Sequence, residues 1–201
     1  MTLDQYRDLA DRLLRPFVAV AVRVGAGPDL ISVVAFVAAL AAGVSFGLAT
    51  DHRLWYLLGA GLVLANGWLD ILDGAVAREI GHDSAAGDLL DHVLDRYADV
   101  AIIVGLAAGL NRYVLGIAAV TGVLLTSYLG TQAQAVGLDR VYAGVLGRAD
   151  RLALVGAVTA VAPWISAVRG VDPVAALLVV FAVIGHLTAL QRFLGAWRSL
   201  G

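Results

Sequence analysis

Hydrophobic stretches long enough to cross a lipid bilayer recur along the whole of this chain. Of its 201 residues, 60% are hydrophobic and only 15% are charged, and a crossing helix needs about 20 mostly apolar residues. Six such stretches are expected, near residues 29–49, 54–78, 86–110, 112–135, 150–168 and 172–195. The sequence therefore predicts an all-α, polytopic membrane protein with six transmembrane helices, in which residues 1–201 form a single domain.

The first segment, residues 1–24, has a different pattern. Its apolar residues recur at helical spacing with charged residues between them, which is typical of an amphipathic helix that lies in the membrane interface. Its acidic, polar start is not typical of a cleaved secretory signal. An interfacial helix is therefore expected ahead of a transmembrane bundle that covers residues 29–195.

The positions of the arginines predict how the chain is oriented. With the N-terminus in the cytoplasm, ten arginines fall in inside segments, while Arg53, Arg112 and Arg169 fall outside. Positive residues accumulate on the cytoplasmic side of membrane proteins. We therefore expect a multi-pass protein of the cell membrane with both termini, and any site near Arg78, on the cytoplasmic side.

Six aspartates lie between residues 70 and 95, and four of them, Asp70, Asp73, Asp91 and Asp95, form two pairs that interrupt the hydrophobic pattern of the second and third stretches. Ionised aspartates at membrane depth are costly unless cations or water compensate them, so several together indicate a functional site. Asp70 and Asp73 share one face of the second stretch, and Asp91 and Asp95 lie one turn apart on the third. A short turn joins these stretches, so the two pairs can face each other. Mg²⁺ and Mn²⁺ prefer carboxylate oxygens, and two such ions can clamp a phosphoanhydride. The chain has no cysteine, so thiolate metal sites are excluded.

Three further residues fit a phosphate-containing substrate. Gly74 and Gly87 allow a helix or a ligand to approach the backbone closely. Arg78 offers a fork of donors for a phosphate or a nucleotide. Intramembrane aspartates paired with arginines also occur in ion or proton transporters, which remain an alternative from charge alone. A transporter does not require these glycines and this arginine at fixed offsets.

The complete pattern is D-x2-D-G-x2-A-R-x8-G-x3-D-x3-D, and it closely resembles the signature of the CDP-alcohol phosphotransferases. It is formed by Asp70, Asp73, Gly74, Ala77, Arg78, Gly87, Asp91 and Asp95. Members of that family are membrane enzymes with six spans and an interfacial helix, and many are homodimers. The resemblance implies that an acceptor hydroxyl attacks the lipid-linked phosphorus of a CDP-lipid and releases CMP, with two Mg²⁺ or Mn²⁺ ions as cofactors.

The resemblance also implies roles for single residues. Asp70, Asp73, Asp91 and Asp95 would ligate the metals, and Asp95 would also be the general base that takes the acceptor proton. The remaining motif positions, with the Pro-Asp-x-x-Ser stretch that opens the first span, would hold the CDP-lipid. They are Asp29, Ser32, Gly74, Arg78, Ser84 and Gly87.

Within the family, the chain looks most like phosphatidylinositol-phosphate and archaetidylinositol-phosphate synthases, which take inositol 1-phosphate as acceptor. The expected partners are thus CDP-diacylglycerol or CDP-archaeol, inositol 1-phosphate, membrane lipids and a second copy of the chain, but not nucleic acid. Arg148, Arg151 and Arg192 are expected to bind the acceptor phosphate, because guanidinium forks bind phosphate bidentately.

One departure keeps other acceptors open. The bacterial inositol-phosphate enzymes carry basic residues shortly after a Ser-Tyr pair, whereas this chain has Gly130, Thr131 and Gln132 after Ser127 and Tyr128. Glycerol 3-phosphate, serine or another polar alcohol therefore remains an alternative acceptor for the same chemistry.

Overall fold

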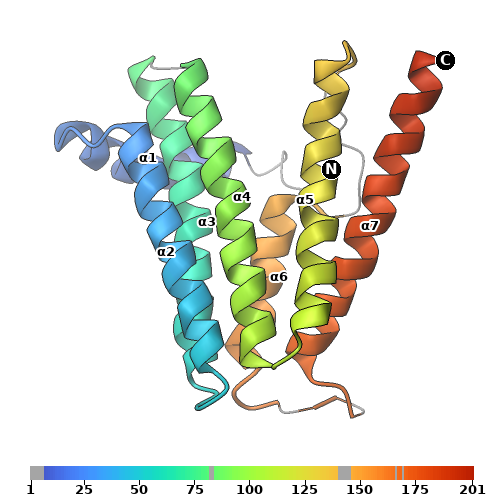
Figure 1. The fold of residues 1–201 in the computed structure, drawn as a ribbon. Coiled ribbons are helices and arrows are strands. Elements are labelled where there is room, and N and C mark those ends of the chain that lie inside the picture. Colours follow the sequence, from blue (N-terminus) through green and yellow to red (C-terminus); the bar gives the residue numbers. More distant parts are fainter. Residues whose placement is uncertain (1–6, 82–83, 140–145, 166, 169) are drawn as a thin grey trace.

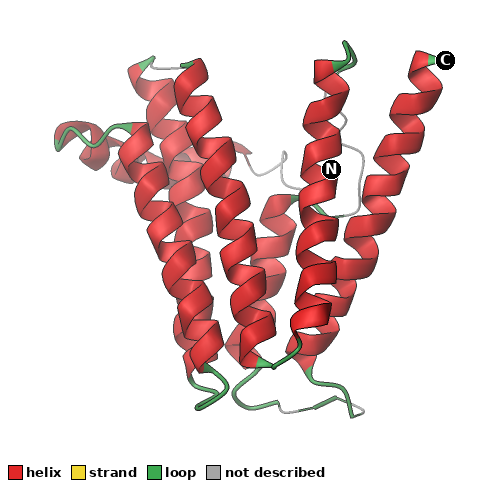
Figure 2. Ribbon diagram, in the orientation of Figure 1, coloured by secondary structure: helices red, strands yellow, loops and turns green. Residues whose placement is uncertain are grey.

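The computed structural model describes residues 7–81, 84–139, 146–165, 167–168 and 170–201, with side chains from residue 13 onward. Within these ranges the chain forms helices joined by loops, and no β-strand is present (Figure 2). The helices are α1 Arg7–Arg23, α2 Pro28–Leu48, α3 Trp55–Ile80, α4 Ala85–Gly109, α5 Tyr113–Ala135, α6 Arg148–Val161 and α7 Pro173–Leu200. The prediction of an all-α fold is confirmed.

Four of the helices, α2, α3, α5 and α7, have the length and apolar composition of a membrane span. α4 is as long as they are, with 25 residues, but it carries the acidic motif and Asp99, so its mean hydropathy is lower. Many large side chains on the helices are exposed, among them Val44, Leu64, Val114 and Val183. Such an apolar surface is unusual for a protein in water and suits contact with lipid.

The expected fifth span, residues 150–168, is wrong at its C-terminal end. α6 has 14 residues and ends at Val161, so it rises about 21 Å, against a hydrocarbon core of about 30 Å. Pro163 follows closely, and a proline cannot donate a backbone hydrogen bond to continue the helix. The other expected helices agree with the structure to within a few residues, except that α7 continues to Leu200.

The helices form two groups that separate toward one end of the molecule (Figure 1). α2 packs against both α3 and α4, α5 packs against α7, and the short α6 contacts α3 and α7. α1 crosses the bundle near the end at which the groups separate. Its buried Leu14 and Val18 share an apolar cluster with Leu72 and Val76 of α3.

Glycines allow two of these helix pairs to touch at the backbone. A Cβ on Gly105 of α4 would overlap the backbone of Gly43 on α2, and a Cβ on Gly185 of α7 would overlap the backbone of Gly122 on α5. Helices in membranes gain van der Waals contact by such close approach, because lipid supplies no hydrophobic drive for their association. The close α2–α4 contact brings the acidic part of α4 beside the start of α2.

We expect Gly105→Ala to lower the stability of the bundle by about 1–3 kcal/mol, the usual cost of overpacking a core. The matched control is Gly61→Ala on α3, where an added Cβ meets no atom within 4 Å and alanine favours the helix. The measurement is the melting temperature of each purified variant in the same detergent. Equal melting temperatures would show that the α2–α4 contact is looser than described.

Candidate functional site

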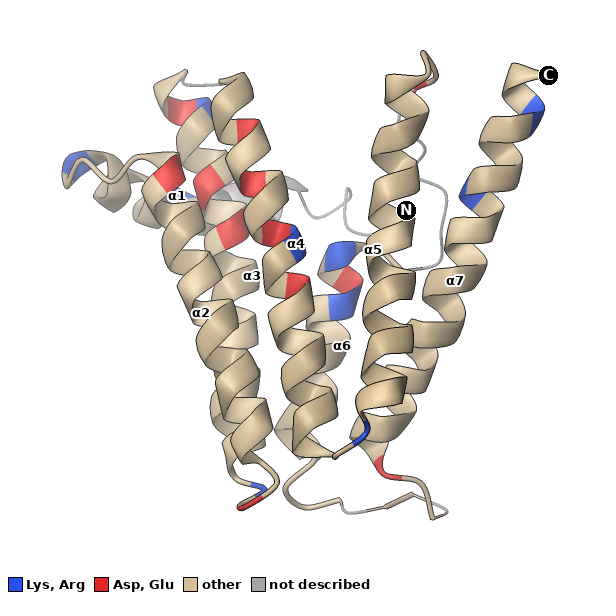
Figure 3. Cartoon of the chain, viewed as in Figure 1, with Lys and Arg blue, Asp and Glu red and all other residues tan. Residues whose placement is uncertain are grey.

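Acidic side chains gather on α3 and α4 toward the end of the bundle that α1 crosses, and most of the rest of the bundle carries few charges (Figure 3). Asp70 of α3 and Asp91 and Asp95 of α4 each offer a carboxylate oxygen, and these oxygens lie within 4.8 Å of one another. All three residues are partly buried. Three converging carboxylates form an all-oxygen donor set, which fits Mg²⁺ or Mn²⁺.

The fourth predicted metal ligand, Asp73, is oriented differently. It is buried, and its Oδ2 accepts a hydrogen bond of 2.6 Å from Ser32 Oγ of α2. The group of carboxylates within 4.8 Å does not include it. The structure therefore brings three of the four predicted ligands together and joins Asp73 to Ser32 beside them.

A polar cavity between α2, α3 and α4 collects most of the residues predicted to hold the CDP-lipid. Asp73 and Asp91 also line it, so it adjoins the carboxylate group. The predicted residues in its lining are Asp29, Ser32, Gly74, Ser84 and Gly87. Positions 58 residues apart in the sequence, Asp29 and Gly87, thus meet in one place.

Ser84 and Gly87 line this cavity from the N-terminal end of α4. Ser84 is the N-cap of α4, and its Oγ accepts a hydrogen bond of 3.0 Å from the backbone N–H of Gly87. A Cβ on Gly87 would lie 3.2 Å from Asp29 Oδ1. Any larger residue at position 87 would therefore crowd the carboxylate of Asp29.

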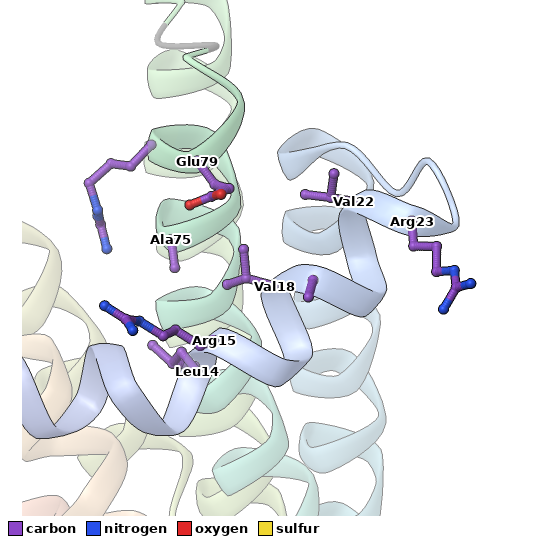
Figure 4. A pocket seen from close by; sticks show the side chains of 9 residues that line it. Leu14, Arg15, Val18, Val22, Arg23, Ala75 and Glu79 are labelled. Carbon is purple, nitrogen blue, oxygen red and sulfur yellow. The ribbon is translucent and has the colours of Figure 1, made fainter.

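Arg78 lies at the edge of this region. It does not line the cavity with Asp29 and Ser32, although its Nη1 lies 3.4 Å from the place of a Cβ on Gly74. Instead it lines a groove of about 740 Å³ between α1 and α3. Arg15, Arg23 and Glu79 line the same groove together with the apolar Leu14 and Val18. In Figure 4 the side chain of Arg23 points away from α3. The groove is therefore amphipathic and rich in cationic groups.

The two predicted acceptor arginines of α6 are engaged with carboxylates. Arg148 Nη1 lies 2.6 Å from Asp70 Oδ2, and its Nη2 lies 2.7 Å from Asp95 Oδ1. Arg151 is buried, and its Nη2 donates a 2.8 Å hydrogen bond to Asp99 Oδ2. Charge-assisted contacts to three different carboxylates thus hold α6 against α3 and α4.

Arg96 continues these contacts on α4. Its Nη2 lies 3.6 Å from Asp95 Oδ2 and 3.7 Å from Asp99 Oδ2, and its Nη1 donates to Ser127 Oγ of α5. The sequence contains a signal for this arrangement, since Asp95 and Asp99 are one helical turn apart and Arg148 and Arg151 are nearly so. From the sequence, both α6 arginines are assigned to the acceptor phosphate, and their ion pairs with Asp70, Asp95 and Asp99 are missed.

Arg192, the third predicted acceptor residue, lies on α7. Its Nη1 donates a hydrogen bond of 2.6 Å to the backbone carbonyl of Thr126 on α5. It therefore ties the α5–α7 pair, whereas Arg148 and Arg151 contact the acidic residues of α3 and α4.

Residues 26–187 match the family model of CDP-alcohol phosphatidyltransferases. The chain belongs to the CDP-alcohol phosphatidyltransferase family. Because members of this family are transferases, the chain is a transferase and not the transporter that intramembrane charges alone would allow.

Two similar proteins cover most of the chain. An archaetidylinositol phosphate synthase of Methanothermobacter thermautotrophicus is 30% identical over 98% of this chain and 95% of its own length. A phosphatidylinositol phosphate synthase of Cutibacterium acnes is 31% identical over 75% and 73%.

Solved structures of one family member share this fold. The phosphatidylinositol phosphate synthase of Mycobacterium tuberculosis with bound CDP-DAG has a TM-score of 0.79 and is 26% identical, covering 92% of this chain and 94% of its own. Its complex with manganese and citrate has a TM-score of 0.80 at 25% identity, covering 92% and 88%. A divalent metal and a CDP-lipid thus occur on this architecture.

We expect Asp91→Asn to weaken Mn²⁺ binding by more than about tenfold, since it removes a charged ligand atom from the carboxylate group, and even residues that only orient a ligand are worth about 10- to 100-fold. Asp88→Asn is the matched control, because Asp88 lies on the same helix outside that group. Free Mn²⁺ measured by electron paramagnetic resonance during a titration gives both affinities. Equal losses in the two variants would contradict the assignment of the ligands.

Proposed function

We propose that this chain transfers the phosphatidyl or archaetidyl group of a CDP-lipid to the hydroxyl of inositol 1-phosphate and releases CMP. One observation carries the proposal: the carboxylates of Asp70, Asp91 and Asp95 converge beside the cavity that Asp29, Ser32 and the other motif residues line. The synthases to which the chain is similar are named for inositol phosphate products, which supports the acceptor.

The chain's own residues suit the parts of this reaction. Asp95 would accept the proton of the acceptor hydroxyl while the oxygen of that hydroxyl bonds to the lipid-linked phosphorus and the bond from this phosphorus to CMP breaks. Ser32 holds the carboxylate of Asp73 in place, and Gly74 and Gly87 leave room for the nucleotide beside it. Metals held by Asp70, Asp73, Asp91 and Asp95 would neutralise the charge that develops on the phosphoryl and leaving oxygens.

The acceptor phosphate needs cations on the same side of the site. Arg148, Arg151 and Arg192 are the residues we propose for it, and Arg148 lies nearest to the proposed base, with its guanidinium at 2.7 Å from Asp95. Gly130, Thr131 and Gln132 supply no charge on α5. This favours glycerol 3-phosphate, serine or another polar alcohol as the second candidate acceptor, with the donor and the chemistry unchanged.

We further propose six crossings by α2 to α7, with α1 in the interface. The C-terminal ends of α2, α4 and α6 lie at one end of the bundle, and those of α3, α5 and α7 lie at the other (Figure 1). The groove of Arg15, Arg23 and Arg78 suits phosphate headgroups at the interface.

We propose that the carboxylate end faces the cytoplasm, that residues 1–201 form one domain, and that a second copy completes a homodimer.

The reaction is tested by CMP release from the purified protein in detergent with Mn²⁺. CDP-archaeol and CDP-diacylglycerol are offered in turn against inositol 1-phosphate, glycerol 3-phosphate, serine and inositol. We expect release with inositol 1-phosphate, and release with another alcohol alone would move the function to the second candidate.

In Asp95→Asn, turnover should fall by about 100-fold or more while CDP-lipid binding persists, and Asp51→Asn at the far end should leave turnover intact. Full turnover in Asp95→Asn would exclude that residue as the base.

The topology is tested by cysteine labelling, for which the chain is suited because it has no cysteine of its own. Asp51 and Asp139 are exposed in loops at opposite ends of the bundle. In intact cells, a maleimide that cannot cross the membrane should label Asp51→Cys and should reach Asp139→Cys only after permeabilisation. The reverse pattern would invert the orientation, and labelling of both would contradict the number of crossings.

A further inference from the structure

Arg148 contacts two of the three converging carboxylates. Its guanidinium joins Asp70 Oδ2 at 2.6 Å to Asp95 Oδ1 at 2.7 Å, and its side chain is 14% exposed. Asp70 and Asp95 are two of the three residues whose oxygens converge within 4.8 Å. One arginine from α6 therefore bridges the carboxylates of α3 and α4 that form the metal donor set.

A guanidinium and a divalent cation compete for such oxygens. Both are cations that seek the same lone pairs, and two positive groups at contact distance in a poorly solvated site repel each other strongly. The other oxygen of Asp95, Oδ2, lies 3.6 Å from Arg96 Nη2, so arginines lie near both oxygens of this carboxylate. A metal that binds Asp70 Oδ2 or Asp95 Oδ1 therefore competes with Arg148 for that oxygen.

Arg148 is held in this place incompletely. Its Nε is buried and has no hydrogen-bond partner in the part of the chain that the structure describes. A buried donor without a partner loses its hydration without compensation. Two ion pairs thus stabilise this position of the guanidinium, while the unpartnered Nε destabilises it. The unpartnered Nε lowers the free energy needed to move the guanidinium away from the carboxylates.

We propose that Arg148 is an internal cation that competes with the divalent metal for Asp70 and Asp95, and that metal binding releases its guanidinium for the acceptor phosphate. The inference rests on the proposed function, in which these carboxylates hold metal, and deepens it. Metal and acceptor affinity become coupled through one side chain, so each must strengthen the other. Arg148 acts on the carboxylates as a positioning residue, while Arg151 stays paired with the buried Asp99.

The test is the affinity of the purified protein for Mn²⁺ in detergent, without CDP-lipid or acceptor, measured by electron paramagnetic resonance after removal of metal with a chelator. We expect the Kd for Mn²⁺ to fall about tenfold in Arg148→Ala, because the competing cation is gone. Added ethylguanidinium should raise the Kd of this variant again and leave the wild type unchanged. Arg148→Gln, which keeps part of the aliphatic stem and a polar end without the charge, should show the same fall and guards against a packing defect in the alanine variant.

Arg53→Ala is the matched control. Arg53 also pairs with an aspartate, Asp172, at 3.3 Å, but it does so at the opposite end of the bundle. Its removal should leave the Kd for Mn²⁺ unchanged. A structural loss alone would weaken Mn²⁺ binding in the Arg148 variants, whereas loss of a competitor tightens it.

An unchanged or higher Kd in Arg148→Gln would overturn the inference. The proposed function would stand in that case, as long as the wild type releases CMP with Mn²⁺. Conversely, tighter Mn²⁺ binding in the Arg148 variants without CMP release from any acceptor by the wild type would support the competition and count against the proposed reaction.

Discussion

The site depends on a chain of alternating charges that runs across three helices. Arg148 and Arg96 each lie between two carboxylates, and Asp95 and Asp99 each lie between two arginines, so charges that are costly at membrane depth compensate one another. Removing one partner from a buried pair leaves an uncompensated charge, which costs more than the pair contributes. This series of ion pairs therefore holds α6 against α3 and α4, and losing any one of its charges would be costly. Its members in order are Asp70, Arg148, Asp95, Arg96, Asp99 and Arg151.

The bundle supplies the closeness that these contacts need. Backbone contact at Gly43 and Gly105 draws α4 against α2, which places the acidic face of α4 beside Asp29 and Ser32. The Ser32–Asp73 hydrogen bond then links α2 to α3 at the same level. Without small residues at the crossing, α2 could not contact α3 and α4 at once, and the cavity between them would open. Packing in the apolar half of the bundle thus determines the geometry in the charged half.

Much of this was predictable because it depends on short-range periodicity. Hydropathy predicts the helices, and the motif spacing predicts that four carboxylates converge, of which those of Asp70, Asp91 and Asp95 lie within 4.8 Å of one another. The length of α6 was not predictable from apolar residues alone, because they continue past the end of that helix at Val161. The partners of Arg148 and Arg151 were missed for a different reason. They lie more than 50 residues away on other helices. The spacing of Asp95 and Asp99 matches that of Arg148 and Arg151, but a sequence does not show which helices pack together.

The same chain of charges explains how one site can be stable in a bilayer and still bind metal and anionic substrates. Asp99 and Arg151 are both buried and form the inner end of this series of ion pairs. Asp70 and Arg148 form the outer end and are more exposed. Exchange of one cation for another at the outer end keeps the carboxylates compensated throughout. The arginine that leaves is an anion-binding group next to the proposed base, so the charge that pairs with the carboxylates becomes the charge that binds the acceptor.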